Sequence, residues 1–155
     1  MVAGDVGRAK LNRAYAKQLS APLAILDKRR EDDSEEAEVM HVIGDVKGKN
    51  AVMFDDEILT GGSLVGLVEA LKNEGANQIY AGITHGILSG PAVRRIEESL
   101  LEELVVTNTV PVPLDKQKGK IKVLSVGELF AEAIKRIHNS ESVSTLFAPK
   151  EENGR

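Results

Sequence analysis

Residues 50–64, NAVMFDDEILTGGSL, contain the pattern that decides the fold of this chain. A short apolar run at 50–54 leads directly into two acids, Asp55 and Asp56, and then into a loop with the sequence Thr-Gly-Gly-Ser at 60–63. Apolar residues then recur with helical spacing at Leu64, Leu67, Val68 and Leu71. A strand, a glycine-containing loop and an amphipathic helix in this order predict one repeating unit of an α/β protein.

The same alternation of short apolar runs and amphipathic segments extends along the chain. Strands are predicted at 1–3, 22–26, 50–54, 78–83, 104–106 and 121–124. Helices are predicted at 11–19, 64–74, 91–96 and 126–137. Gly75 is expected to end the second helix, and Ser125 with Glu128 predicts a capping box at the start of the last one. The fold class is therefore α/β, a mostly parallel sheet flanked by helices on both faces, whose ligands bind at the carboxyl ends of the strands.

One domain is expected over residues 1–147, followed by a polar tail at 148–155. Two segments are predicted to be irregular, the charge run at 28–38 and a Pro- and Lys-containing connection at 111–120. The chain opens on a strand-like stub, from which we expect that a preceding part of the protein is absent.

Composition excludes several classes of function. The formal net charge of -4 argues against a nucleic-acid partner, because such binding depends on cationic contacts to phosphate. There is no cysteine, which excludes disulfides and thiolate zinc sites and fits a cytoplasmic protein. No apolar run approaches the ~20 residues of a membrane span, so no membrane association is expected.

The Thr-Gly-Gly-Ser loop has the chemistry of an anion site. Glycines let backbone N–H groups converge on an anion, and a helix N-terminus adds free donors and partial positive charge. The hydroxyls of Thr60 and Ser63 add further donors. Asp55 and Asp56 do not favour phosphate, but they suit sugar hydroxyls or a divalent cation. The alternative is an acidic strand end followed by an ordinary capped helix.

The segment resembles the phosphoribosyl diphosphate (PRPP) signature of type I phosphoribosyltransferases and PRPP synthetases. Five further segments are similar to the synthetases in particular and follow in the same order, namely DVGRAK at 5–10, LDKRR at 26–30, THGILSGPA at 84–92, VVTNTVP at 105–111 and residues 122–147. The resemblance implies the C-terminal half of a ribose-phosphate diphosphokinase with a type I phosphoribosyltransferase fold. Such an enzyme transfers diphosphate from ATP to ribose 5-phosphate in nucleotide biosynthesis.

The resemblance also implies roles for individual residues. Asp55 and Asp56 would contact the ribose hydroxyls, and the loop residues Thr60, Gly61, Gly62 and Ser63 would hold the 5-phosphate of ribose 5-phosphate or PRPP. Asp5 would lie near the sugar and its Mg²⁺. Lys28 and Arg30 would be catalytic, on a flexible loop that closes over the transferring diphosphate. The tail residues Ser142, Ser144 and Phe147 would belong to a regulatory site.

Two features depart from the resemblance. Leu59 stands where the family usually has an acid, and the half that supplies most ATP-binding groups lies outside the chain. A homo-oligomer is expected by analogy. Alternatives are a PRPP-consuming phosphoribosyltransferase, a non-catalytic regulatory homologue, or a domain that binds another phosphate. His85 is expected beside the site without a metal role.

Overall fold

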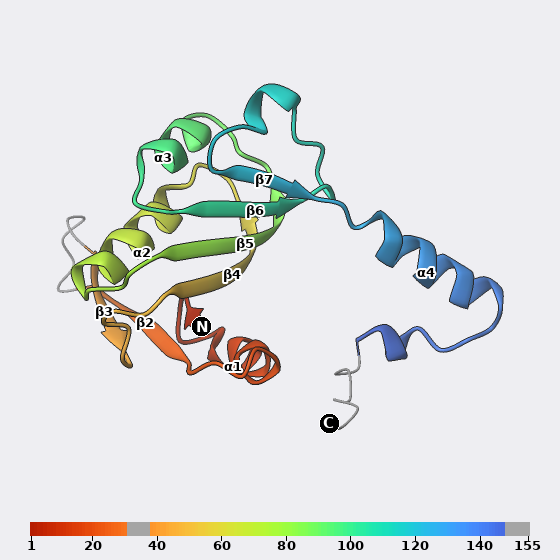
Figure 1. Ribbon diagram of the computed structural model, residues 1–155, viewed down its shortest axis with the longest axis horizontal. Helices are drawn as coiled ribbons and strands as arrows, with labels where there is room; N and C mark the ends of the chain where they lie inside the picture. The colour runs from red at the N-terminus through yellow and green to blue at the C-terminus, as the bar shows by residue number, and fades with distance from the viewer. Residues whose placement is uncertain (31–37, 148–155) are drawn as a thin grey trace. The chain divides into compact units, whose positions relative to one another are not determined.

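The computed structural model describes the backbone of residues 1–30 and 38–147, and the side chains of residues 1–27 and 41–147. Its seven-stranded sheet has the order β3-β2-β1-β4-β5-β6-β7 (Figure 1). The strands are β1 Val2–Ala3, β2 Ala24–Arg30, β3 Glu38–Ile43, β4 Ala51–Ile58, β5 Ile79–Gly86, β6 Glu103–Thr107 and β7 Ile121–Leu124. Every neighbouring pair is parallel except β2 and β3. The predicted mostly parallel α/β sheet is therefore confirmed.

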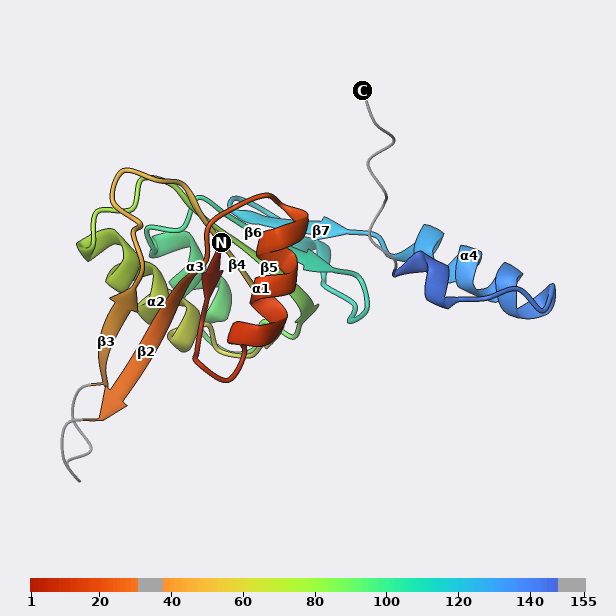
Figure 2. The same ribbon diagram turned by 90° about the horizontal axis from the view of Figure 1, so that it is seen from below.

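Helices cover both faces of this sheet. They are α1 Ala9–Gln18, α2 Gly62–Asn73 and α3 Ala92–Glu98. The Tyr15 ring of α1 meets Phe54 of β4 edge to face, whereas Leu67 of α2 lines the same cavity as Met53, the residue that precedes Phe54 in the strand. Because successive strand residues point to opposite faces, α1 and α2 lie on opposite sides of the sheet (Figure 2).

The core lies mainly between the sheet and the helices α2 and α3. Its largest fully buried side chains are aliphatic, among them Leu26, Leu71, Ile79, Leu104 and Ile121. Gly75, with φ of 82°, follows the end of α2, and the N–H of Ala76 bonds the carbonyl of Leu71. This left-handed residue ends the helix as the sequence predicted, because glycine adopts positive φ without strain.

Residues 28–30 correct one sequence prediction. The charge run was expected to be irregular from residue 28, but β2 continues to Arg30 and pairs with β3 in antiparallel register, with Lys28 opposite Met40 and Arg30 opposite Glu38. The prediction missed β3 entirely. The hairpin is held by backbone hydrogen bonds, which charged residues form as well as apolar ones, and charged residues are common on edge strands. Residues 31–37, the remainder of the predicted flexible loop, lie outside the described residues.

A second compact unit begins at Ser125, and the first comprises Met1–Leu124. The second unit contains α4 Gly127–His138 and a short 3-10 turn at Ser144–Leu146. The predicted helix is present, but the capping box is wrong. The Ser125 hydroxyl accepts from the N–H of Gly127, two residues on, and the residue that precedes the helix is Val126. The predicted tail at 148–155 lies outside the described residues.

Within the second unit, α4 buries none of its residues, and its apolar side chains Leu129, Phe130, Ile134 and Ile137 are exposed. No helix among the described residues is long and apolar enough to cross a membrane.

Candidate functional site

The two acids lie within β4 and not after it. The strand was predicted to end at residue 54, but it continues to Ile58, and Asp55 pairs in register with Ile83 of β5. The side chains of Asp55 and Asp56 therefore start from opposite faces of the sheet. Both are exposed, as is Glu57. Glu57 lies on the same face as Asp55, two residues further along the strand.

Arg8 joins these two carboxylates. Its Nη1 lies 2.7 Å from Asp55 Oδ1, and its Nη2 lies 2.7 Å from Asp56 Oδ2. The hydrogen bond from Arg8 holds the pKa of Asp56 below its ordinary value, and the same bond raises the pKa of Arg8. Hereafter the acid pair means Asp55 and Asp56. The sequence did not predict this role, because Arg8 appears there only within the motif DVGRAK.

Asp5 lies in the turn that leads into α1, and its side chain contacts the residue that precedes this helix. Its Oδ1 accepts a hydrogen bond of 2.8 Å from the N–H of Arg8, the residue that precedes α1. Its Oδ2 is 3.8 Å from Arg8 Nε. The carboxylates of Asp5 and of the acid pair thus surround the Arg8 guanidinium. The carboxylate of Asp5 is oriented by its hydrogen bond with the Arg8 backbone N–H.

The Thr-Gly-Gly-Ser loop leads directly into α2. Gly61 precedes the helix with φ of 74°, in the left-handed region, and makes no side-chain cap. The first N–H groups of an α-helix have no acceptor inside the helix, so the donors at the start of α2 are available to an anion. A positive φ favours glycine strongly, which explains why the sequence has glycine here.

Neighbouring segments hold this loop in place. Arg95 of α3 donates from Nη1 to the carbonyl of Thr60 at 3.1 Å. The N–H of Ser89 donates to the Leu59 carbonyl at 2.9 Å, and the N–H groups of Ile87 and Leu88 donate to Ile58. The turn after β5, which the sequence singled out as THGILSGPA, therefore supports the loop through its backbone.

A cavity of about 390 Å³ lies between this loop and β4, and we call it the loop cavity. Its lining includes the whole Thr-Gly-Gly-Ser loop, Asp55, Arg8, Glu57 and Gly4. Asp56 does not line it. Glu57 and Gly4 were missed from the sequence, although the period of two along a strand, applied over the full length of β4, would have indicated Glu57.

A second hollow of about 470 Å³, the open-face groove, lies on the α1 side of the sheet. It is lined by both acids of the pair, by Arg8, and by apolar and aromatic side chains such as Tyr15, Phe54 and Tyr80. Arg8, Phe54, Asp55 and Ile83 line both hollows, so the two hollows meet at Arg8 and Asp55.

His85 lies beside the site, as expected, since it pairs in register with Glu57 on the neighbouring strand. Its Nδ1 is 2.9 Å from Thr109 Oγ1, and it lines neither hollow. Lys28 and Arg30 lie on β2, and their side chains lie outside the described part of the structure.

The tail residues of the predicted regulatory site belong to the second unit. There, the Ser142 and Ser144 hydroxyls are 2.7 Å apart, and Arg136 donates from Nη1 to the Ser142 carbonyl. Phe147 is 70% exposed. The regulatory role remains a prediction.

The donor set near Arg8 suits a hard cation. Among the described residues no group of three or more His, Cys, Asp or Glu side chains is arranged to hold a metal. Mg²⁺, however, is usually held by one or two carboxylates together with waters and substrate phosphates. The acid pair supplies two carboxylates that converge on one positive group, so these residues fit Mg²⁺ bound together with a ligand.

Comparison with known proteins places the chain in a family. A family model described as the phosphoribosyl synthetase-associated domain matches residues 31–148, more than half of the chain. The chain belongs to that family. A ribose-phosphate pyrophosphokinase of Caldanaerobacter subterraneus subsp. tengcongensis is 54% identical over 147 residues, which cover 95% of this chain and 46% of that protein. The protein of the same name from Bacillus subtilis (strain 168) is 47% identical over 148 residues, covering 96% of this chain and 46% of that protein.

A solved structure extends the similarity to three dimensions. The phosphoribosylpyrophosphate synthetase from Mycobacterium smegmatis matches with a TM-score of 0.80 at 37% identity, over 90% of this chain and 44% of that chain. The fold is thus the type I phosphoribosyltransferase-like fold of the ribose-phosphate pyrophosphokinase family. The chain spans about half the length of the relatives it matches.

Proposed function

We propose that this chain is the sugar-phosphate-binding half of a ribose-phosphate diphosphokinase and binds ribose 5-phosphate and PRPP. The observation that carries the proposal is the loop cavity, which combines uncapped helix donors and the left-handed Gly61 with a carboxylate, Asp55, on the adjoining strand. One part of the cavity suits a phosphate and another suits hydroxyls. Ribose 5-phosphate carries both groups on one small ring.

In this proposal the loop holds the 5-phosphate. The backbone N–H groups at the start of α2 and the hydroxyls of Thr60 and Ser63 donate to its oxygens, while Arg95 keeps the loop carbonyl fixed. Asp55 and Asp56 accept hydrogen bonds from the 2- and 3-hydroxyls and so orient the ring. Positioning of this kind accounts for much of the catalysis of phosphoryl transfer, because little covalent help is needed.

The complete reaction transfers the β,γ-diphosphate of ATP to the 1-hydroxyl of ribose 5-phosphate. A bond forms between that oxygen and the β-phosphorus, and the bond from the β-phosphorus to the oxygen that bridges it to the α-phosphorus breaks, so that AMP leaves. The proton of the 1-hydroxyl is released in the same transfer. Mg²⁺, when bound, offsets charge on the phosphate oxygens. Lys28 and Arg30 are proposed to contact the diphosphate from the β2–β3 hairpin, and Asp5 keeps Arg8 and the start of α1 oriented toward the site.

ATP binding is proposed to depend mostly on groups outside this chain, in a homo-oligomer that includes the other half of the enzyme. We therefore expect the purified chain to bind ribose 5-phosphate in calorimetry but to form no PRPP from ATP, Mg²⁺ and ribose 5-phosphate. Efficient turnover by the chain alone would contradict the proposed division of the site.

A second candidate function is supported by one residue of the loop. Leu59 is half exposed next to the cavity, where the family resemblance leads us to expect an acid. A chain without that carboxylate fits a regulatory homologue that assembles with active subunits. If the purified chain binds no sugar phosphate and Leu59→Asp restores binding, the regulatory homologue is the better description.

A further inference from the structure

The acid pair already holds a cation that belongs to the protein. Arg8 contacts both carboxylates at 2.7 Å, and Asp55 Oδ1 also accepts the N–H of Asp56 at 2.8 Å. The oxygens that would meet a sugar hydroxyl or a metal ion are therefore partly occupied. The Arg8 side chain is 33% exposed, so the guanidinium has access to solvent on one side.

The backbone of Arg8, in contrast, is held firmly. Its N–H donates to Asp5 Oδ1, and its carbonyl accepts from both the backbone N–H and the Nδ2 of Asn12, at 3.0 and 3.1 Å. Asn12 is only 1% exposed. A displacement of the guanidinium therefore requires rotation of the side chain only, while α1 stays in place.

There is room for that rotation. Arg8 lines both the loop cavity and the open-face groove, which meet at Asp55. A guanidinium that leaves the acid pair can move along either hollow without entering the core. A divalent cation at the acid pair and the guanidinium would repel each other, because like charges are disfavoured at short range.

We propose that Arg8 is the resident counter-ion of the acid pair and determines which ligands reach it, because a divalent cation or a sugar diol must displace the guanidinium. The inference deepens the proposed function, since it concerns the carboxylates that we assign to the sugar. It makes Arg8 a specificity-determining residue. A ligand with phosphate alone can bind the loop without displacing Arg8, whereas one that engages the acid pair must compete with it.

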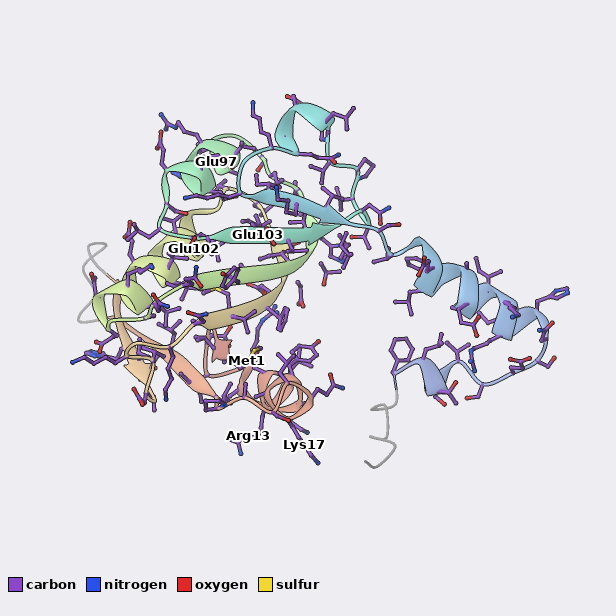
Figure 3. All side chains as sticks on the ribbon, viewed as in Figure 1. Met1, Arg13, Lys17, Glu97, Glu102 and Glu103 are labelled. Atoms are coloured by element: carbon purple, nitrogen blue, oxygen red, sulfur yellow. The ribbon has the colours of Figure 1, made fainter. Side chains whose placement is uncertain are left out.

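The test compares Arg8→Met with Arg13→Met. Met keeps much of the apolar stem and removes the charge in both variants. Arg13 is on the same helix but points away from the sheet (Figure 3), and it lines neither hollow. The probe is Mn²⁺ alone, a stand-in for Mg²⁺, followed by calorimetry and by the relaxation of water protons. We expect Arg8→Met to bind Mn²⁺ about threefold to thirtyfold more tightly than wild type, the range for two partly exposed charge pairs, and Arg13→Met to match wild type.

Equal affinities in Arg8→Met and Arg13→Met, or weaker Mn²⁺ binding in Arg8→Met, would overturn the proposal. Should Arg8→Met fail to fold, the wild-type chain provides the test through the guanidinium NMR signals of Arg8, assigned by their loss in Arg8→Lys. Addition of Mg²⁺ should release the hindered rotation of that group, and an unchanged signal at saturating Mg²⁺ would overturn the proposal.

Titration with ribose 5-phosphate separates this inference from the proposed function. Tighter Mn²⁺ binding in Arg8→Met with no ribose 5-phosphate binding by any variant supports the Arg8 inference and refutes the proposed function. If ribose 5-phosphate binds and Arg8→Met leaves the Mn²⁺ affinity unchanged, the proposed function is supported and the Arg8 inference is refuted.

Discussion

Replacing Gly61 by alanine tests whether the left-handed residue before α2 builds the anion site. Gly61 has φ of 74°, and a Cβ added there meets its nearest atoms, in Ala92, at 3.7 Å, which is ordinary contact. The substitution therefore introduces backbone strain and no steric clash. The cost of a left-handed conformation for an L-residue is about 1–2 kcal/mol. For a chain of this size that corresponds to a fall in Tm of roughly 2–8 °C.

Ligand binding should respond more strongly than stability. If the loop relaxes toward negative φ, at least one backbone donor turns away from the phosphate. A hydrogen bond to a charged group contributes about 1.5–3 kcal/mol, so affinity for ribose 5-phosphate should fall about tenfold to a hundredfold. Calorimetry measures the affinity, and urea unfolding measures the stability.

Gly48→Ala provides the matched control. Gly48 has nearly the same φ, 70°, and a Cβ there meets nothing within 4 Å. It precedes β4, at the opposite end of the strand from the loop. Both variants should lose similar stability, but only Gly61→Ala should lose affinity. The reasoning is refuted if the two variants lose affinity equally, or if Gly61→Ala binds ribose 5-phosphate as well as wild type does.

Three further predictions concern charged residues of the site. Asp55→Ala should abolish ribose 5-phosphate binding in calorimetry, because the ring loses the acid of the pair that lines the loop cavity, and unchanged affinity would contradict that role. Arg95→Met should weaken inorganic phosphate binding about twofold to tenfold by freeing the loop carbonyl, whereas Arg94→Met, also exposed on α3, should not. The pKa of Asp56 is lowered by its hydrogen bond to Arg8. The contact therefore stabilises the folded state at pH values above the ordinary carboxyl pKa, and this stabilisation is lost as the pH falls through the lowered pKa. In Arg8→Met the Asp56 pKa should rise toward its ordinary value in a carbon-detected NMR titration, and no change would show that Arg8 does not cause the shift.

Strands and helices that depend on local pattern could be predicted from the sequence. The alternation of apolar runs and amphipathic segments indicated β1, the first part of β2, β4, β5, β6 and β7, and the four α-helices of the described residues, because each pattern spans one element. The strand β3 was missed because it follows a charge run. Its pairing with β2 depends on hydrogen bonds between segments, which side-chain periodicity does not report.

The end of β4 shows the same limit. Acidic residues at 55–57 indicate the end of a strand by composition, yet the parallel pairing with β5 continues to Ile58. Leu88 is another case, since it has φ of 49° and is almost fully buried. No local preference predicts a leucine in the left-handed region, and only the packing of the turn after β5 stabilises it there.

The sequence alone determined the α/β class, the strand–loop–helix unit at 50–73 and the chemistry of the Thr-Gly-Gly-Ser loop, because these depend on residue type and short-range spacing. Only the tertiary structure placed Arg8 on the acid pair, since the two segments are 47 residues apart and come together through the parallel pairing of β1 with β4. It also brought Glu57 into the loop cavity and Arg95 against the loop carbonyl. Contacts between distant segments depend on how the sheet and its helices pack, and the side chains that meet there carry no local signal of their partners.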